Sequence, residues 1–287
     1  MVDAGLVVVD KSPGMTSHDV VARVRRLAGT RKVGHAGTLD PMATGVLVLG
    51  VDRATRLLGH LVLTEKAYDA TIRLGVATTT DDAEGEVVST HATDGVPEDV
   101  VVRAELARFV GDIEQVPTAV SAIKVDGQRA YARVRAGEQV ELKARPVTIH
   151  ELVVHEVALP DVRISVRCSS GTYIRAIARD LGVALGTGGH LAALRRTAVG
   201  SFDLSAARTL EELSDDFAVV PIARAARASF PVVDLDEEQA ADVRFGRALD
   251  LVLPAAGPHA VFAPDGEFLA LYEQRGQQAR SVAVFVG

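Results

Sequence analysis

The sequence predicts an α+β fold in which a large N-terminal domain precedes a small, β-rich one. Residues 162–168 alternate apolar and polar side chains, as in a half-buried strand, whereas apolar residues between positions 20 and 27 follow helical spacing. Short apolar segments separated by glycine and proline follow Pro231 and indicate a separate β-rich unit. At 287 residues the chain is long enough for both, so we expect domains at residues 1–228 and 229–287.

The first 110 residues contain three predicted strands and two predicted helices. Ser17 suits the N-cap of the first helix, and Pro97 suits the first turn of the second. The apolar face of the first helix consists of Val20, Val21, Val24 and Leu27. In chain order, these elements are a strand at 6–9, a helix from 17, buried strands at 46–51 and 68–74, and a helix at 97–110.

The remaining elements follow a stretch with little periodicity. Residues 121–147 combine two glycines with many arginines, which predicts a basic surface insertion rather than core. Two paired strands and a helix come next, and Arg175 and Arg179 lie one turn apart on that helix. The predicted elements are strands at 147–159 and 162–168, a helix at 172–185, a helix at 236–244, and short strands at 260–262, 268–272 and 282–285.

Composition predicts an ordinary soluble protein. Hydrophobic residues make up 48% of the chain and charged residues 24%. There is no apolar run of the roughly 18 residues needed to cross a bilayer and no basic segment followed by a hydrophobic signal core, so we expect a cytoplasmic protein without membrane contact. The single cysteine, Cys168, cannot form an internal disulfide or a cysteine metal cluster, and the alternating pattern around it predicts a buried strand position.

The most informative segment is residues 34–45, GHAGTLDPMATG, which holds a carboxylate in a loop rich in glycine and proline. Its glycines permit backbone angles closed to other residues, and Pro41 disfavours a helical conformation of Asp40. The carboxylate is therefore held on a turn. Locally, Asp40 could simply cap its own turn, or the loop could present it at a functional site.

This segment resembles the catalytic loop of the TruB family of tRNA pseudouridine synthases, whose aspartate is the nucleophile. Further motifs resemble the same family in the same order, from about residue 5 to about residue 200. They are VDKSPGMTS at 9–17, KAY at 66–68 followed by LG at 74–75 and TTDDAEG at 79–85, SAIK at 121–124, GTYIR at 171–175, and residues 190–196.

The resemblance implies a pseudouridine synthase fold, with a central mixed, largely antiparallel sheet flanked by helices, and a C-terminal PUA-like domain. It implies no metal or cofactor, because the reaction replaces the bond between uracil N1 and the ribose with a bond from C5 of the same base, without redox change. It also assigns Asp40 as nucleophile and Arg175 as the partner that keeps it ionised, with a lowered pKa. The remaining implied roles are Tyr68 for base stacking and proton transfer, Leu194 for closing the pocket, Tyr173 for its floor, His35 for the space left by the flipped base, Lys11 as a structural or phosphate-binding residue, and Lys124, Arg129 and Arg133 for gripping RNA.

Each residue also has a simpler interpretation. Tyr68 fits a half-buried strand position and Leu194 an ordinary core position. His35 fits a structural histidine, and Arg175 a surface arginine on a helix. The match of several motifs in register favours the functional interpretation.

The net charge of −7 conflicts at first with RNA binding, which normally requires a basic surface. Residues 201–287, however, carry fourteen acidic side chains against seven arginines, so the first 200 residues are balanced. Basic residues gather there in three groups that adjoin the motifs, which favours RNA contact over a merely solvated surface. The groups are Arg23, Arg25, Arg26, Arg31 and Lys32; Lys124, Arg129, Arg133, Arg135, Lys143 and Arg145; and Arg195 and Arg196.

Three functions remain open from the sequence. The chain could be a stand-alone synthase acting on the uridine at position 55 in the T loop of tRNA, as a monomer that needs no protein partner. It could be a guide-RNA-dependent rRNA synthase of the archaeal and eukaryotic type, which the basic insertion disfavours. It could be a non-catalytic tRNA-folding protein, which the intact Asp40, Tyr68 and Arg175 disfavour, although tRNA folding can accompany catalysis.

Overall fold

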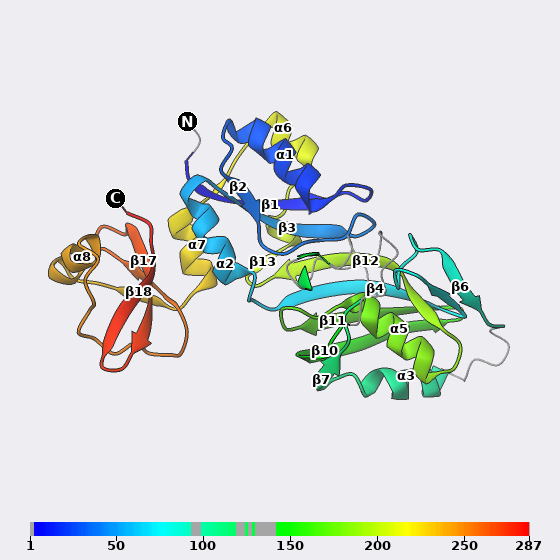
Figure 1. Cartoon of the computed structure of the whole chain (residues 1–287). Helices are drawn as coiled ribbons and strands as arrows, with labels where there is room; N and C mark the ends of the chain where they lie inside the picture. Colours follow the sequence, from blue (N-terminus) through cyan, green and yellow to red (C-terminus); the bar gives the residue numbers. More distant parts are fainter. Residues whose placement is uncertain (1–2, 93–98, 119–123, 126–127, 130–141, 287) are drawn as a thin grey trace.

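The computed structural model describes residues 3–92, 99–118, 124–125, 128–129 and 142–286 (Figure 1). Over these residues, ten strands form one sheet and four form a second. The main sheet is antiparallel except where β3 meets β12, so the expected α+β fold with a mixed sheet is confirmed. Its strands are, in spatial order, β14 (Val220–Pro221), β1 (Gly5–Lys11), β3 (Thr44–Val51), β12 (Gly189–Val199), β4 (Lys66–Leu74), β11 (Asp161–Cys168), β10 (Arg145–Ala158) and β7 (Gly111–Gln115), with β2 (Val33–His35) beside β3 and β13 (Phe202–Asp203) beside β12.

Strand β4 shows how side-chain alternation places a site residue. Tyr68 and Ile72 are buried on one face, whereas Asp69 and Arg73 point to solvent on the other. Because successive side chains of a strand face opposite sides, the buried set fixes the register of Tyr68. Cys168 at the end of β11 is fully buried, as its alternating pattern predicts.

Helices pack on both halves of the main sheet (Figure 1). Helices α3 and α5 lie against the half that contains β4 and β10, and α1 and α6 lie together on the half that contains β1 and β3. The helices are α1 (Ser17–Ala28), α2 (Leu58–Leu61), α3 (Asp99–Ala107), α5 (Ile174–Ala184), α6 (Leu210–Asp215) and α7 (Ile222–Ser229), with 3₁₀ turns η1 (Asp52–Leu57) and η3 (Leu204–Ala206). Among the described residues, none of the helices is long and apolar enough to cross a membrane.

The start of α1 differs from the prediction. Thr16, not Ser17, is the N-cap: its hydroxyl accepts from the amide of Asp19, whose carboxylate accepts from the Thr16 amide in return. This reciprocal pair satisfies two free donors of the first turn. Ser17 is thereby left as a buried first helical residue, and its hydroxyl is free to contact another part of the chain.

Other helix and strand ends shift by a few residues. Helix α5 begins at Ile174, two residues later than predicted, and α3 ends at Ala107; the predicted start of α3 at Pro97 lies outside the described residues. The predicted basic insertion at 121–147 extends too far, because β10 already begins at Arg145 and pairs with β7. Over the described residues, two small hairpins form apart from the two larger sheets, β5 (Val76–Thr78) with β6 (Val87–Thr90) and β8 (Lys124–Val125) with β9 (Gln128–Arg129).

The two halves of the main sheet separate at the centre. Strand β12 pairs with β4 along its length but meets β3 only where Arg195 and Arg196 lie opposite Thr44 and Gly45. Gly45 has φ +96°, and a side chain there would collide with the Arg196 carbonyl, so this junction requires glycine. The loop that holds Asp40 joins β2 to β3 beside this junction.

The C-terminal residues form a second, four-stranded sheet (Figure 1). One hydrophobic core joins it to the first sheet, because Phe262, Phe268 and Phe285 belong to the same buried cluster as Leu6 and Val46. This interface buries large apolar side chains and therefore fixes the position of the second sheet. Its elements are β15 (Val232–Asp234), α8 (Glu237–Arg244), β16 (His259–Phe262), β17 (Phe268–Arg275) and β18 (Gln278–Val284).

Candidate active site

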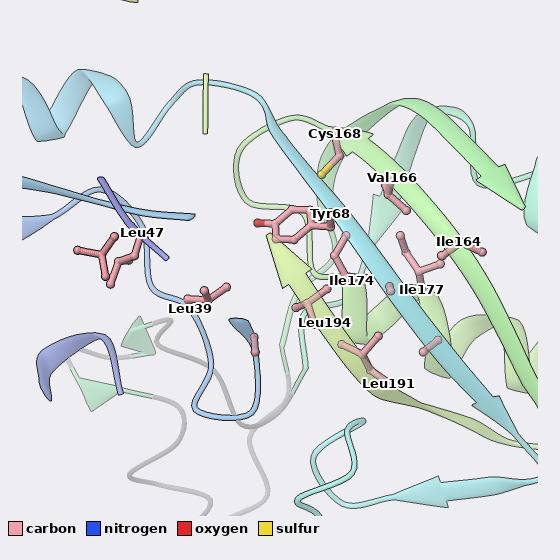
Figure 2. Packing of buried hydrophobic residues seen from close by; sticks show 14 of the residues in the cluster. Leu39, Leu47, Tyr68, Ile164, Val166, Cys168, Ile174, Ile177, Leu191 and Leu194 are labelled. Carbon is pink, nitrogen blue, oxygen red and sulfur yellow. The ribbon is translucent and has the colours of Figure 1, made fainter. Parts of the chain in front are cut away.

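A pocket of about 290 Å³ opens where the two halves of the main sheet separate. Five residues singled out from the sequence line it together: Asp40, Tyr68, Tyr173, Arg175 and Leu194. They come from one loop, two strands and the start of α5, so only the fold brings them together. Figure 2 shows the Tyr68 ring emerging from β4 with its hydroxyl directed toward the segment of Leu39 and Leu47, and Leu194 below the ring.

The backbone of the Asp40 loop is held by side chains from three elements. Ser17 Oγ at the start of α1 donates to the Leu39 carbonyl at 3.0 Å and accepts from the Leu39 amide at 2.9 Å. Lys11 at the end of β1 donates to the Pro41 carbonyl at 3.1 Å. Arg196 on β12 donates to the carbonyls of Gly37 and Thr38. The loop is thus fixed by contacts that local sequence does not reveal.

Arg175 lies between two carboxylates. Its Nε is 3.1 Å from Asp40 Oδ2, and its terminal nitrogens reach Asp40 Oδ1 at 3.4 Å and Asp82 Oδ2 at 3.2 Å. It also donates to the Thr80 carbonyl at 2.9 Å. A planar guanidinium held on two sides in this way presents a fork in a fixed orientation to Asp40.

The electrostatic environment of Asp40 differs from the expectation. Burial raises the pKa of Asp40 above its usual value, and this effect outweighs the Arg175 guanidinium, which lowers it; the Asp82 carboxylate raises it further. The expectation of a lowered pKa is therefore wrong, because it counted the arginine but neither the desolvation nor the second carboxylate. Asp40 still keeps a third of its side-chain surface open to the pocket, where a substrate atom can reach it.

Sequence reasoning missed the role of Asp82, although it singled out the surrounding motif. The Asp82 side chain is 5% exposed and forms an isolated bridge through its backbone to Leu191 on β12. The preceding Asp81 has φ +60°, which makes the tight turn that aims Asp82 at Arg175. The sequence did hold a signal for this role, because Asp82 stands in a polar segment three residues before Gly85, where a turn is expected.

Tyr68 and Tyr173 are positioned by different means. Burial raises the pKa of the Tyr68 hydroxyl, and the Arg196 guanidinium, which hydrogen-bonds this hydroxyl, opposes that effect. Tyr173 is fixed through its backbone, because its amide donates to Gln115 Oε1 at 2.7 Å and its carbonyl accepts from Gln115 Nε2 at 3.0 Å. Gln115 ends β7, so the far edge of the sheet helps place the pocket wall.

Two basic residues prove to be internal. Arg196, which we grouped with Arg195 as RNA-facing surface, is 1% exposed and forms part of the pocket wall, so that interpretation is wrong for Arg196. Lys11 is fully buried and also donates to the carbonyls of Ser12 and Met15, which favours its structural role over phosphate binding. The three carbonyls that Lys11 contacts use all three hydrogen-bond donors of its ammonium group, which leaves none for a phosphate.

His35, another residue singled out from the sequence, does not line the pocket. His35 is half-buried on β2, and its ring lies edge-on to that of His18 with 5.7 Å between the ring centroids. Burial lowers the pKa of His35. The backbones of Lys124 and Arg129 are paired in the β8–β9 hairpin, and Arg133 lies outside the described residues. Their proposed roles stay predictions.

Comparison with known families decides the relationship. The profile described as "TruB family pseudouridylate synthase (N terminal domain)" matches residues 25–174, and two profiles of tRNA pseudouridine synthase C-terminal domains match residues 175–225 and 230–286. The chain belongs to the TruB family. The TruB match thus spans both sheets described above.

Curated relatives and solved structures agree with TruB membership. A tRNA pseudouridine synthase B of Arthrobacter sp. is 58% identical, over 98% of this chain and 96% of its own, and one of Thermobifida fusca is 57% identical over 99% of each. A solved H/ACA RNP bound to a substrate RNA has a chain with TM-score 0.76 and 25% identity, covering 99% of this chain and 85% of that one. A Cbf5–Nop10–Gar1 complex gives a TM-score of 0.75 and 28% identity, covering 99% and 84%.

Proposed function

We propose that this chain isomerises uridine to pseudouridine at position 55 in the T loop of tRNA. The observation that carries the proposal is the Asp40–Arg175 pair in a pocket also lined by Tyr68 and Leu194. An extruded uracil would stack on Tyr68, a contact that contributes about 1 to 3 kcal/mol per base. Leu194 would close the pocket on the other side of the base.

Asp40 is the nucleophile in this proposal. Its carboxylate attacks either the ribose C1′ or uracil C6, and the bond between N1 and the ribose breaks. C5 then bonds to C1′, and the bond between Asp40 and the attacked carbon breaks, which regenerates the carboxylate. The C5 hydrogen leaves as a proton, and N1 gains one, so atoms and electrons balance without an added reactant. Arg175 orients the carboxylate with its fork, and Asp82 holds Arg175 from the other side.

Two similarities point toward different RNA substrates, and one is much closer. The curated relatives named tRNA pseudouridine synthase B share 57 to 58% of their residues with this chain, whereas the structures of H/ACA complexes share 25 to 28%. The closer similarity supports a stand-alone enzyme that needs no guide RNA or protein partner, with residues 1–228 and 229–287 as its domains. An accompanying tRNA-folding activity is compatible with this assignment.

The test uses an unmodified tRNA transcript whose uridines carry tritium at C5. Purified protein alone should release one equivalent of label per tRNA, and replacing the T-loop uridine at position 55 should abolish release. Asp40→Asn should release none while still binding tRNA, because phosphate contacts elsewhere supply most of the affinity. Release that requires an added guide RNA, or full release by Asp40→Asn, would contradict the proposal.

A further inference from the structure

Arg196 is a buried cation beside the proposed reacting groups whose role the mechanism above leaves open. Its side chain is almost fully enclosed, and it donates from Nε to the Val46 carbonyl at 2.7 Å and from its terminal nitrogens to the carbonyls of Thr38 and Gly37 at 3.2 and 3.3 Å. Those acceptors belong to β3 and to the loop of Asp40. The guanidinium is therefore fixed relative to the nucleophile on the rigid centre of the sheet.

Arg196 and Tyr68 lie directly opposite each other in the pairing of β12 with β4, and both line the pocket. The guanidinium hydrogen-bonds the Tyr68 hydroxyl across this pair. Arginine has only donors, so in this contact the Tyr68 oxygen must accept. The hydrogen of the hydroxyl is then left to point away from Arg196, and the hydroxyl is directed from β4 toward the loop side of the pocket in Figure 2. An accepting contact on one side thus sets the direction in which Tyr68 can donate.

We propose that Arg196 is the positioning residue that fixes the Tyr68 hydroxyl as a hydrogen-bond donor to the bound nucleotide and holds it in register with the Asp40 loop. This inference rests on the proposed function, because it concerns the same pocket. Arg196 touches no reacting atom; it acts through Tyr68 and through the loop backbone. One side chain on β12 thereby connects the two groups that approach the base from opposite halves of the sheet.

The charges around Tyr68 agree with this role. Arg196 is the cation that hydrogen-bonds the hydroxyl, and it favours the ionised form, whereas the Cys168 thiol on β11 and the Asp40 carboxylate disfavour it. Lys66, on the same strand, lines the same pocket, and its ammonium group donates to the carbonyls of Val62 and Thr64. Loss of the Arg196 charge should therefore raise the Tyr68 pKa beyond the effect of burial.

The first experiment measures this pKa without any RNA. The chain has four tyrosines, so biosynthetic incorporation of 3-fluorotyrosine gives few fluorine resonances, and Tyr68→Phe identifies the one from Tyr68. Arg196→Gln should raise the titration midpoint of that resonance by about one pH unit or more. The neighbouring control Arg195→Gln removes an arginine that pairs with Asp10 at 2.7 Å, and it should leave the midpoint unchanged. Equal midpoints in wild type and Arg196→Gln would overturn the proposal.

The second experiment uses Arg196→Lys, which keeps the positive charge. It also tests the proposal if the Arg196→Gln variant does not fold. Single-turnover label release should fall about 100-fold with tRNA affinity little changed, because the hydroxyl loses its fixed direction. The double variant with Tyr68→Phe should be no slower than Tyr68→Phe alone, since both changes remove the same contribution. Losses that multiply in the double variant would show that Arg196 only stabilises the fold. If wild type itself releases no label, the proposed function fails, while the fluorine titration still tests the Arg196–Tyr68 contact.

Discussion

Ser17 and Leu39 exchange two hydrogen bonds across 22 residues of sequence, and this exchange fixes the residue that precedes Asp40. The Ser17 hydroxyl donates to the Leu39 carbonyl and accepts from its amide, at 3.0 and 2.9 Å, in a fully buried setting. A single hydroxyl therefore binds both the amide and the carbonyl of Leu39, as a neighbouring strand would do in a sheet. That contact holds the backbone next to Asp40, whose carboxylate lies 3.1 Å from Arg175 Nε.

We expect Ser17→Ala to destabilise the protein and to slow catalysis. Both polar groups of Leu39 would lose their partner in a buried site, which costs about 1 to 3 kcal/mol in free energy of unfolding. The single-turnover rate should fall while tRNA affinity stays within a few fold. Denaturant unfolding and label release measure the two effects. Ser214→Ala, at an exposed serine of α6, is the control; equal stability of the two variants would contradict the role given to Ser17.

Arg175→Lys should behave as a severe substitution despite its retained charge. Lysine cannot contact Asp40, Asp82 and the Thr80 carbonyl together, because it lacks the planar fork. We expect a loss of about 100-fold in single-turnover rate and a much smaller loss of tRNA affinity. A rate equal to wild type would show that the Asp40–Arg175 pair is unimportant for the reaction.

The pH dependence of the reaction should report the ionisation of Asp40. In the proposed mechanism Asp40 must be ionised to attack, and burial raises its pKa in the free protein. We therefore expect kcat/KM to fall as the pH decreases through a value above the usual aspartate pKa of about 3.9. The Asp82 carboxylate contributes to that raised pKa, so its removal in Asp82→Asn should move the acid limb to lower pH. The maximal rate should fall as well, because Arg175 loses its second partner.

Measurement of kcat/KM from pH 4 to 8 for wild type and Asp82→Asn tests this prediction. Glu86→Gln, at an exposed acidic residue nearby in sequence, is the matched control for a general charge effect. An acid limb that stays in place in Asp82→Asn, or moves to higher pH, would show that Asp82 does not act on Asp40 electrostatically.

How far the sequence predicts the fold depends on whether each segment follows its local pattern. The start of β4 was predicted to within two residues and the start of α1 to within one, since alternation and helical spacing reflect the burial that each element has in the structure. Strand β12 was not predicted at all, because its Ala-Ala-Leu-Arg-Arg core has high helix propensity. It is a strand because it lies between β3 and β4, and such pairing overrides local preference.

The site divides in a similar way. Asp40, Tyr68 and Arg175 were identified through motifs, but Ser17, Asp82 and the buried position of Arg196 were not. Each of the latter acts through contacts with backbone or charges far away in sequence, such as the 158 residues that separate Arg196 from the Thr38 carbonyl. The same reasoning gave the wrong direction for the Asp40 pKa, because burial is a property of the assembled pocket.

The uneven charge distribution leads to a last prediction, about which surface grips RNA. Residues 201–287 carry the whole net charge of −7, so counterion release should come mainly from the first 200 residues. Neutralising Arg129, Arg133 and Arg135 together should weaken tRNA binding at low salt. The slope of the logarithm of the binding constant against the logarithm of the salt concentration should also become shallower, by roughly 0.7 to 0.9 for each phosphate that the variant no longer neutralises.

The matched control neutralises three exposed arginines of the second sheet and its helix, Arg244, Arg275 and Arg280. Substitution is preferable to truncation here, because Phe262 and Phe285 share a core with Leu6, and deletion would expose it. Both triple variants are titrated against wild type from low to physiological salt. If the slope falls more in the C-terminal variant than in the Arg129, Arg133 and Arg135 variant, the second sheet rather than the insertion binds the phosphates, and the charge distribution misleads about where tRNA binds.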